Sequence, residues 1–254
     1  MTQVRGFGSA LTLLLDQREL HPTELAERAG LGADEVRTVL AGSVPAREQV
    51  RRLAAALGFH ALDLFVLAGL AVPDDLAPPD HTAHHWVRQI VVDAARLPPT
   101  ERRSLLRRVR SLPREERRTA FAATRLPPGG GGPGSRVMLM FRHRNLDPLG
   151  LAMSLGLVTP TYLSAVTFHV IGLGRKELTP RLVTDFAALL GLDARELAAL
   201  TGVPLTREPA PPAPEAVDAA ALLWEARRLC AGQAEQVAGM VRSLRARAET
   251  PEPR

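Results

Sequence analysis

The sequence predicts an all-α protein that contains one helical unit twice. Apolar residues recur at helical rather than alternating spacing along nearly all of the 254 residues. The segment LLLDQRELHPTELAERAGL (13–31) returns as LMFRHRNLDPLGLAMSLGL (139–157), where Leu20, Pro22, Leu25, Ala26, Gly30 and Leu31 recur at one constant offset. Such self-similarity is typical of a duplicated folding unit. We therefore expect two related halves, each large enough to bury a core of its own.

Composition narrows the class of protein. Hydrophobic residues make up 46% of the chain and aromatic residues only 4%, which favours cores of Leu, Ala and Val. The formal net charge of +5 comes almost wholly from arginine, and it favours polyanionic partners without specifying one. The single cysteine, Cys230, excludes an intrachain disulfide and fits a reducing compartment. We find no secretion signal and no apolar run of ~18 residues, so we expect a cytoplasmic protein with no membrane partner.

Two kinds of break divide the chain. RLPPGGGGPGSR (125–136) contains four consecutive glycines and three prolines, a composition that predicts a linker rather than a helix. Proline-rich spacers also occur at 72–80 and 207–216. We expect a first domain at 1–73, a first helical hairpin at 80–124, the linker at 125–136, a second domain at 137–206 and a second hairpin at 214–248.

The apolar periodicity predicts the same order of helices in each half. In the first half we expect helices at about 7–19, 22–29, 33–41, 46–57, 61–70, 82–96, 99–111 and 114–123. In the second half we expect them at about 137–144, 148–155, 160–171, 179–190, 194–201, 215–230 and 232–247. Asp147-Pro148 and Thr159-Pro160 each combine an N-cap acceptor with a proline at the first helical position, and therefore predict helix starts.

The second and third helices of each half carry the most specific pattern. Leu25-Ala26 is followed by Gly30, and Leu151-Ala152 by Gly156. Alanine lets two helices approach closely, and glycine adopts the left-handed conformation of a sharp helix stop. The pattern resembles the helix-turn-helix of the Cro/cI (XRE) family over roughly 16–70 and 142–202. It implies two tandem lambda-repressor-like domains, each with an appended helical hairpin, and a third helix that enters the major groove of DNA.

The resemblance implies a sequence-specific transcriptional regulator that binds double-stranded DNA through two nonidentical recognition helices. The second domain is the better candidate, because its third helix opens with uncharged side chains that could reach base edges, and a basic loop follows. The residues concerned are Thr159, Thr161, Tyr162, Ser164, His169, Arg175 and Lys176.

The first domain departs further from the family. Its candidate residues are Glu35, Arg37 and Thr38, and the neighbouring carboxylates of Asp34 and Glu35 are repelled by phosphate unless Glu35 accepts from cytosine. Alternatively, both acids complement the helix N-terminus. Proline also replaces the phosphate-binding glutamine of the family at the start of each second helix. The alternative function is a protein–protein interaction module that keeps the scaffold but has lost DNA binding.

The helices after each domain share an apolar stripe but not their charge. The arginine-rich first pair could clamp DNA without sequence preference, or its arginines could form a solvated face. The shared stripe favours packing against the domains, between the pairs, or with another protein or a second chain. His81, His84 and His85 have metal-ligand spacing without the further ligands of a site, and no catalytic motif is present. We expect no enzyme activity, cofactor or metal site.

Overall fold

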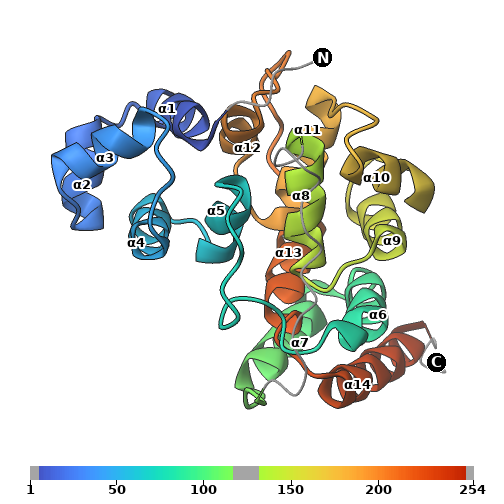
Figure 1. Cartoon of the computed structure of the whole chain (residues 1–254). Coiled ribbons are helices and arrows are strands. Elements are labelled where there is room, and N and C mark those ends of the chain that lie inside the picture. Colours follow the sequence, from blue (N-terminus) through green and yellow to red (C-terminus); the bar gives the residue numbers. More distant parts are fainter. Residues whose placement is uncertain (1–5, 117–131, 250–254) are drawn as a thin grey trace.

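A computed structural model describes residues 6–116 and 132–249, and within these ranges it contains helices and no strands (Figure 1). The all-α fold class is therefore confirmed. The first half contains α1 (Phe7–Gln17), α2 (Pro22–Ala29), α3 (Ala33–Leu40), α4 (Arg47–Leu57), α5 (Ala61–Leu67), the 3-10 turn η1 (His81–Ala83), α6 (His84–Ala94) and α7 (Pro99–Ser111). The second half contains α8 (Pro133–Arg142), α9 (Pro148–Val158), α10 (Ala165–Gly172), α11 (Pro180–Leu190), α12 (Ala194–Thr201), α13 (Pro214–Ala226) and α14 (Ala231–Glu249).

The first repeat, α1 to α5, has the predicted turn between its second and third helices. α2 ends at Gly30, whose φ of 61° is the left-handed conformation that glycine adopts without a steric penalty. Leu31 and Gly32 complete a connection of three residues before α3 begins. Leu25 and Val36 are fully buried, so the two helices are fixed against each other by side chains from both.

The second repeat, α8 to α12, differs at the equivalent place. We expected Gly156 to stop the helix, but α9 continues through it to Val158, because glycine permits a turn without enforcing one and Val158 packs into the core. α10 begins at Ala165 instead of residue 160, and its N-cap is Ser164 rather than Thr159. The connection is therefore six residues long, twice the length of its counterpart in the first repeat.

The predicted linker is also too long at its C-terminal end. α8 begins at Pro133, where a first-turn proline needs no amide proton, so residues 133–136 are helical. Residues 125–131 lie outside the described ranges. Of the helix expected at 114–123, residues 114–116 are not helical, and the remainder again lies outside the described ranges.

Helices of each half pack against helices of the other half. α1 packs against α12 of the second repeat, and α5 packs against α8. The two C-terminal helix pairs, expected as hairpins, exchange partners: α6 packs against α14, α7 packs against α13, and α6 also contacts α13 (Figure 1). The buried side chains of all these elements form one continuous apolar cluster. Both halves therefore contribute to a shared core.

Ion pairs join the halves at several of these contacts. The buried guanidinium of Arg144, after α8, donates to both carboxylate oxygens of Asp63 on α5 at 2.6 and 2.7 Å. Arg18, after α1, reaches Glu196 of α12 at 2.6 Å. Arg102 of α7 donates to Asp218 of α13 at 2.6 Å. Each pair links residues that are distant in sequence, so it orients one half relative to the other.

Candidate nucleic-acid interface

In the first repeat, α3 presents a polar face. Val36 and Val39 are buried against α1 and α2, which leaves the opposite side of the helix exposed. That side carries the three candidates predicted for this repeat, Glu35, Arg37 and Thr38, together with Asp34. The geometry therefore brings the predicted residues together on one accessible surface.

The contacts of Glu35 identify its role. One carboxylate oxygen accepts from the backbone amide of Gly32 and the other from the Gln49 side chain, each at 2.8 Å. The Gly32 hydrogen bond, followed by that of Gln49, lowers the pKa of Glu35, so the side chain is an ionised helix cap. The geometry supports the interpretation that Glu35 complements the helix N-terminus. We therefore do not assign Glu35 a contact with cytosine.

Arg37 and Thr38 are available to a ligand. Arg37 pairs with Asp34 one turn earlier, but the two side chains are 68% and 88% exposed. Such exposed pairs stabilise a protein by only ~0–1 kcal/mol, so a phosphate or a base can displace Asp34 at little cost. The Thr38 hydroxyl donates to the Asp34 carbonyl at 2.7 Å and still has lone pairs that can accept.

In the second repeat, the predicted threonine and serine side chains hydrogen bond to other groups of the protein. Thr161 is only 5% exposed and donates to the buried carboxylate of Asp185, so it cannot reach DNA while the protein is folded. Thr159 donates to the Leu155 carbonyl at 2.9 Å. Ser164 accepts from the amide of Thr167 and caps α10. The expectation that Thr161 contacts bases is corrected, because its partner lies in another helix that the local pattern does not reveal.

The remaining candidates of the second repeat are exposed but surround an apolar face. Residues 148–174 contain no Asp, Glu, Lys or Arg, and Arg175 and Lys176 follow directly after them. A surface that binds DNA is expected to be basic, because phosphates dominate affinity. The exposed large apolar side chains here are Leu149, Met153, Leu157, Tyr162, Val166 and Leu173. His169 is also exposed.

The spacing of apolar residues in the sequence already indicates this apolar face. Leu149, Met153 and Leu157 recur every four residues, which places them in one row along α9. The core-facing row of the same helix is also apolar, and includes Leu151, Leu155 and Val158. A helix that is apolar on two sides has more hydrophobic surface than its own core covers.

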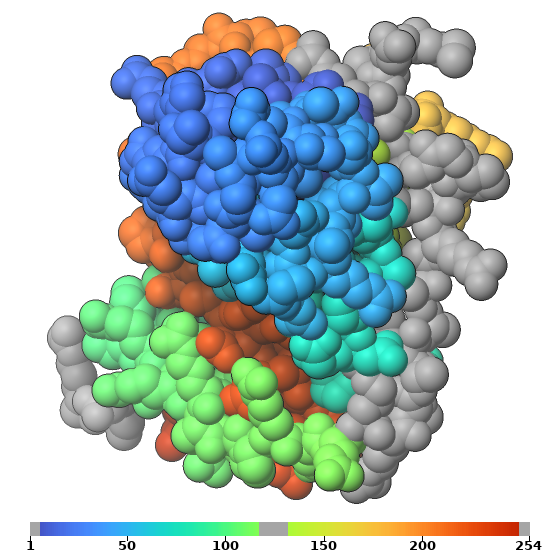
Figure 2. Space-filling view, turned by 60° about the vertical axis from the view of Figure 1, so that its left-hand side comes forward, coloured from blue at the N-terminus to red at the C-terminus, as the bar shows by residue number. Residues whose placement is uncertain are grey.

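The exposed side of α7 is rich in arginine. Leu105 and Val109 are buried, and Arg103, Arg107 and Arg108 lie exposed with no carboxylate partner in the described ranges. Figure 2 shows α7 below the first repeat on one face of the molecule. The helices of the first repeat and the arginine-rich α7 are therefore seen together in this view.

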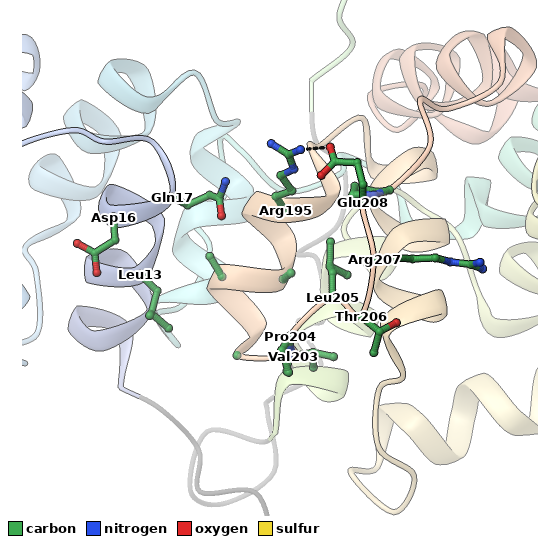
Figure 3. Close-up of a pocket in the computed structure, with 14 residues that line it drawn as sticks. Leu13, Asp16, Gln17, Arg195, Val203, Pro204, Leu205, Thr206, Arg207 and Glu208 are labelled. Atoms are coloured by element: carbon green, nitrogen blue, oxygen red, sulfur yellow. Dashed lines mark ion pairs between the residues drawn. The ribbon is translucent and has the colours of Figure 1, made fainter.

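An open groove lies between the halves, where α1 faces α12 and the following chain segment (Figure 3). Leu13, Asp16 and Gln17 line one wall, and Arg195 with residues 203–209 lines the other. Arg195 pairs with Glu208 across the top of the groove, which neutralises both charges. We therefore regard the groove as the junction of the two repeats rather than a ligand site.

Comparison with protein-family models, curated proteins and solved structures finds no match. None of the described helices is long and apolar enough to cross a membrane. Within the same ranges, His, Cys, Asp and Glu side chains form no group of three or more that could hold a metal ion.

Proposed function

We propose that the protein is a DNA-binding transcriptional regulator that places α3 of its first repeat in the major groove. The observation that carries this proposal is the three-residue turn at Gly30, which joins α2 to an α3 whose exposed face is polar. Arg37 and Thr38 are the residues on that face with groups free to contact bases. In the second repeat Thr161 is buried and residues 148–174 carry no charged side chain, so we prefer the first repeat to the second as the DNA-binding copy.

The charges of the first repeat suggest which helices would supply the affinity for the DNA backbone. From α2 to α4, arginines and acidic residues are equal in number: Arg28, Arg37, Arg47, Arg51 and Arg52 against Glu24, Glu27, Asp34, Glu35 and Glu48. This region therefore adds little net attraction for phosphate. The exposed arginines of α7, which have no carboxylate partner among the described residues, would supply it as contacts that hold the duplex without reading its sequence.

A binding titration tests both parts. A duplex selected from a random pool by the full chain is labelled, and fluorescence anisotropy is measured at a low and a moderate salt concentration. We expect Arg37→Ala with Thr38→Ala to weaken specific binding by ~10-fold or more, because each good base contact discriminates by ~1–3 kcal/mol. Replacing Arg103, Arg107 and Arg108 with Ala should lower the slope of log K against log salt by ~2–3, at ~0.9 per phosphate.

The matched control is Arg175→Ala with Lys176→Ala in the second repeat, which should leave the affinity unchanged. Loss of binding in this variant, with full binding by the Arg37 and Thr38 variant, would assign DNA recognition to the second repeat. Absence of binding at low salt would refute the DNA-binding function.

A second function is favoured by the apolar face of the second repeat. Contiguous exposed apolar surface on a folded protein is typical of a protein interface. The second repeat would then be the copy that keeps the scaffold and binds protein, while the first repeat binds DNA.

A further inference from the structure

We infer that the α9–α10 face of the second repeat is a self-association surface, through which two chains pair face to face. This inference names the partner for the protein-binding function and does not depend on DNA binding. The face is defined by six exposed residues: Leu149, Met153, Leu157, Tyr162, Val166 and Leu173.

The apolar residues are concentrated on this face. The six side chains are between 37% and 80% exposed, and the other large apolar side chains that are exposed in the described ranges, Val44, Val217 and Met240, belong to other helices or loops. Tyr162 joins the rows of α9 and α10, because its ring lies directly over Gly156. A Cβ at Gly156 would lie 3.2 Å from a ring carbon, so glycine is what lets the ring lie this close to α9.

The absence of charge favours a second copy as the occupant. The chain carries a net charge of +5, so most of its surface repels another copy of itself. Residues 148–174 contain no charged side chain, and the arginines recorded beside this segment, Arg88 and Arg181, each pair with a carboxylate, so two of these faces can meet without burying an unpaired like charge. In a two-fold pair each face meets its own equivalent, and an uncharged apolar surface is complementary to itself.

The area is sufficient for a reversible dimer. The exposed parts of the six side chains amount to roughly 500–600 Å² in each copy, or about 1,000–1,200 Å² in a pair. That total is near the lower limit of specific interfaces, so we expect a dissociation constant on the order of 10 μM.

The position of the face is compatible with DNA binding by the first repeat. Figure 1 shows α9 and α10 on one side of the molecule and α2 and α3 on the other, with α8, α11 and α13 between them. A dimer formed through α9 and α10 therefore leaves both α3 helices and both α7 helices uncovered. Two chains would bring two reading helices into one assembly.

Sedimentation velocity of the full chain, at concentrations from about 1 to about 200 μM, tests the inference. We expect the wild type to change from monomer to dimer over this range. Val166→Glu and Tyr162→Glu should each weaken the dimer at least 10-fold, because each places a carboxylate in the apolar contact. The matched control is Val44→Glu, which adds the same charge at an equally exposed apolar position of the first repeat and should leave the dimer intact.

Circular dichroism spectra and thermal melts establish that each variant is folded. A wild type that remains monomeric at the highest concentration overturns the inference, as does a dimer that both face variants leave unchanged. Neither result bears on DNA binding by the first repeat, which is tested separately with the Arg37→Ala and Thr38→Ala variant. Conversely, the effect of that variant on DNA binding does not change what sedimentation shows about the dimer.

Discussion

Replacing Asp63 with Asn should destabilise the whole protein, because it leaves a buried positive charge without its partner. Asp63 and Arg144 are both 0% exposed, and their two hydrogen bonds of 2.6 and 2.7 Å form a bidentate pair. Arg227 lies close enough that Arg144, second to burial, helps to lower its pKa to about 10. Asp63 is thus the carboxylate that compensates the buried guanidinium of Arg144, and together with Glu225 it also raises the pKa of the half-buried Arg227.

The magnitude follows from the burial of the pair. Removing one partner of a buried ion pair costs ~3–5 kcal/mol, against a total stability of ~5–15 kcal/mol for an ordinary protein. Because Asp63 belongs to α5 and Arg144 follows α8, the loss should be cooperative and should weaken the contact between the two repeats. Urea unfolding followed by circular dichroism at 25 °C measures it, with Asp34→Asn at the exposed Asp34–Arg37 pair as the matched control at ~0–1 kcal/mol.

A double replacement checks the physical reason. Asp63→Leu with Arg144→Met removes both charges and keeps apolar volume, so it should recover much of the stability that Asp63→Asn loses. A loss below ~1 kcal/mol for Asp63→Asn would refute the reasoning. So would a double variant less stable than the single one, because the cost would then come from packing rather than from the unpaired charge.

Two further predictions concern acid stability and helix packing. Burial lowers the pKa of His143 from 6.5 to about 4, so between these values the unfolded chain binds a proton that the folded chain excludes. The free energy of unfolding should therefore fall as the pH drops through this window, by up to ~3 kcal/mol, and urea unfolding at several pH values should show a smaller slope in His143→Asn. Gly8→Ala would place its Cβ 2.4 Å from the Val39 carbonyl oxygen, which forces α1 away from α3. We expect a loss of ~1–3 kcal/mol in thermal or urea unfolding, and almost none for Gly6→Ala, whose Cβ meets no atom within 4 Å.

The helices themselves were largely predictable from local sequence. The bounds expected at 22–29, 99–111 and 194–201 are those of α2, α7 and α12. Their ends carry strong local signals: proline in the first turn of α2 and α7, and left-handed glycine after α2 and α12. Such signals act within a few residues, so one sequence suffices to interpret them.

The connection in the second repeat shows where local signals fail. Thr159-Pro160 and Gly156 are as plausible a helix start and stop as the equivalents in the first repeat. The outcome depended on Thr161 hydrogen bonding to Asp185 and on Val158 packing into the core. Asp185 lies 24 residues away from Thr161, and the hydrogen bond and the burial of Val158 together outweigh a permissive glycine and a first-turn proline.

The two candidate surfaces were likewise predictable only in part. The sequence predicted that Arg37 and Thr38 share a helix with Asp34 and Glu35, and that Glu35 could act as a helix cap. It did not reveal that Gln49 also binds Glu35, or that the second repeat exposes an apolar face instead of a basic one. An apolar row on a helix is compatible with a core or with an interface, and only the positions of neighbouring helices distinguish them.

The sequence by itself determined a duplicated set of helices, because periodicity, caps and turns are local properties that recur wherever the same residues recur. Tertiary structure alone decided how the copies combine. α1 lies on α12, α6 lies on α14, and Arg144 reaches Asp63, because each half exposes apolar and charged groups that the other half covers or neutralises. It also decided which copy has a polar exposed face on its third helix, since burial depends on neighbours that periodicity does not specify.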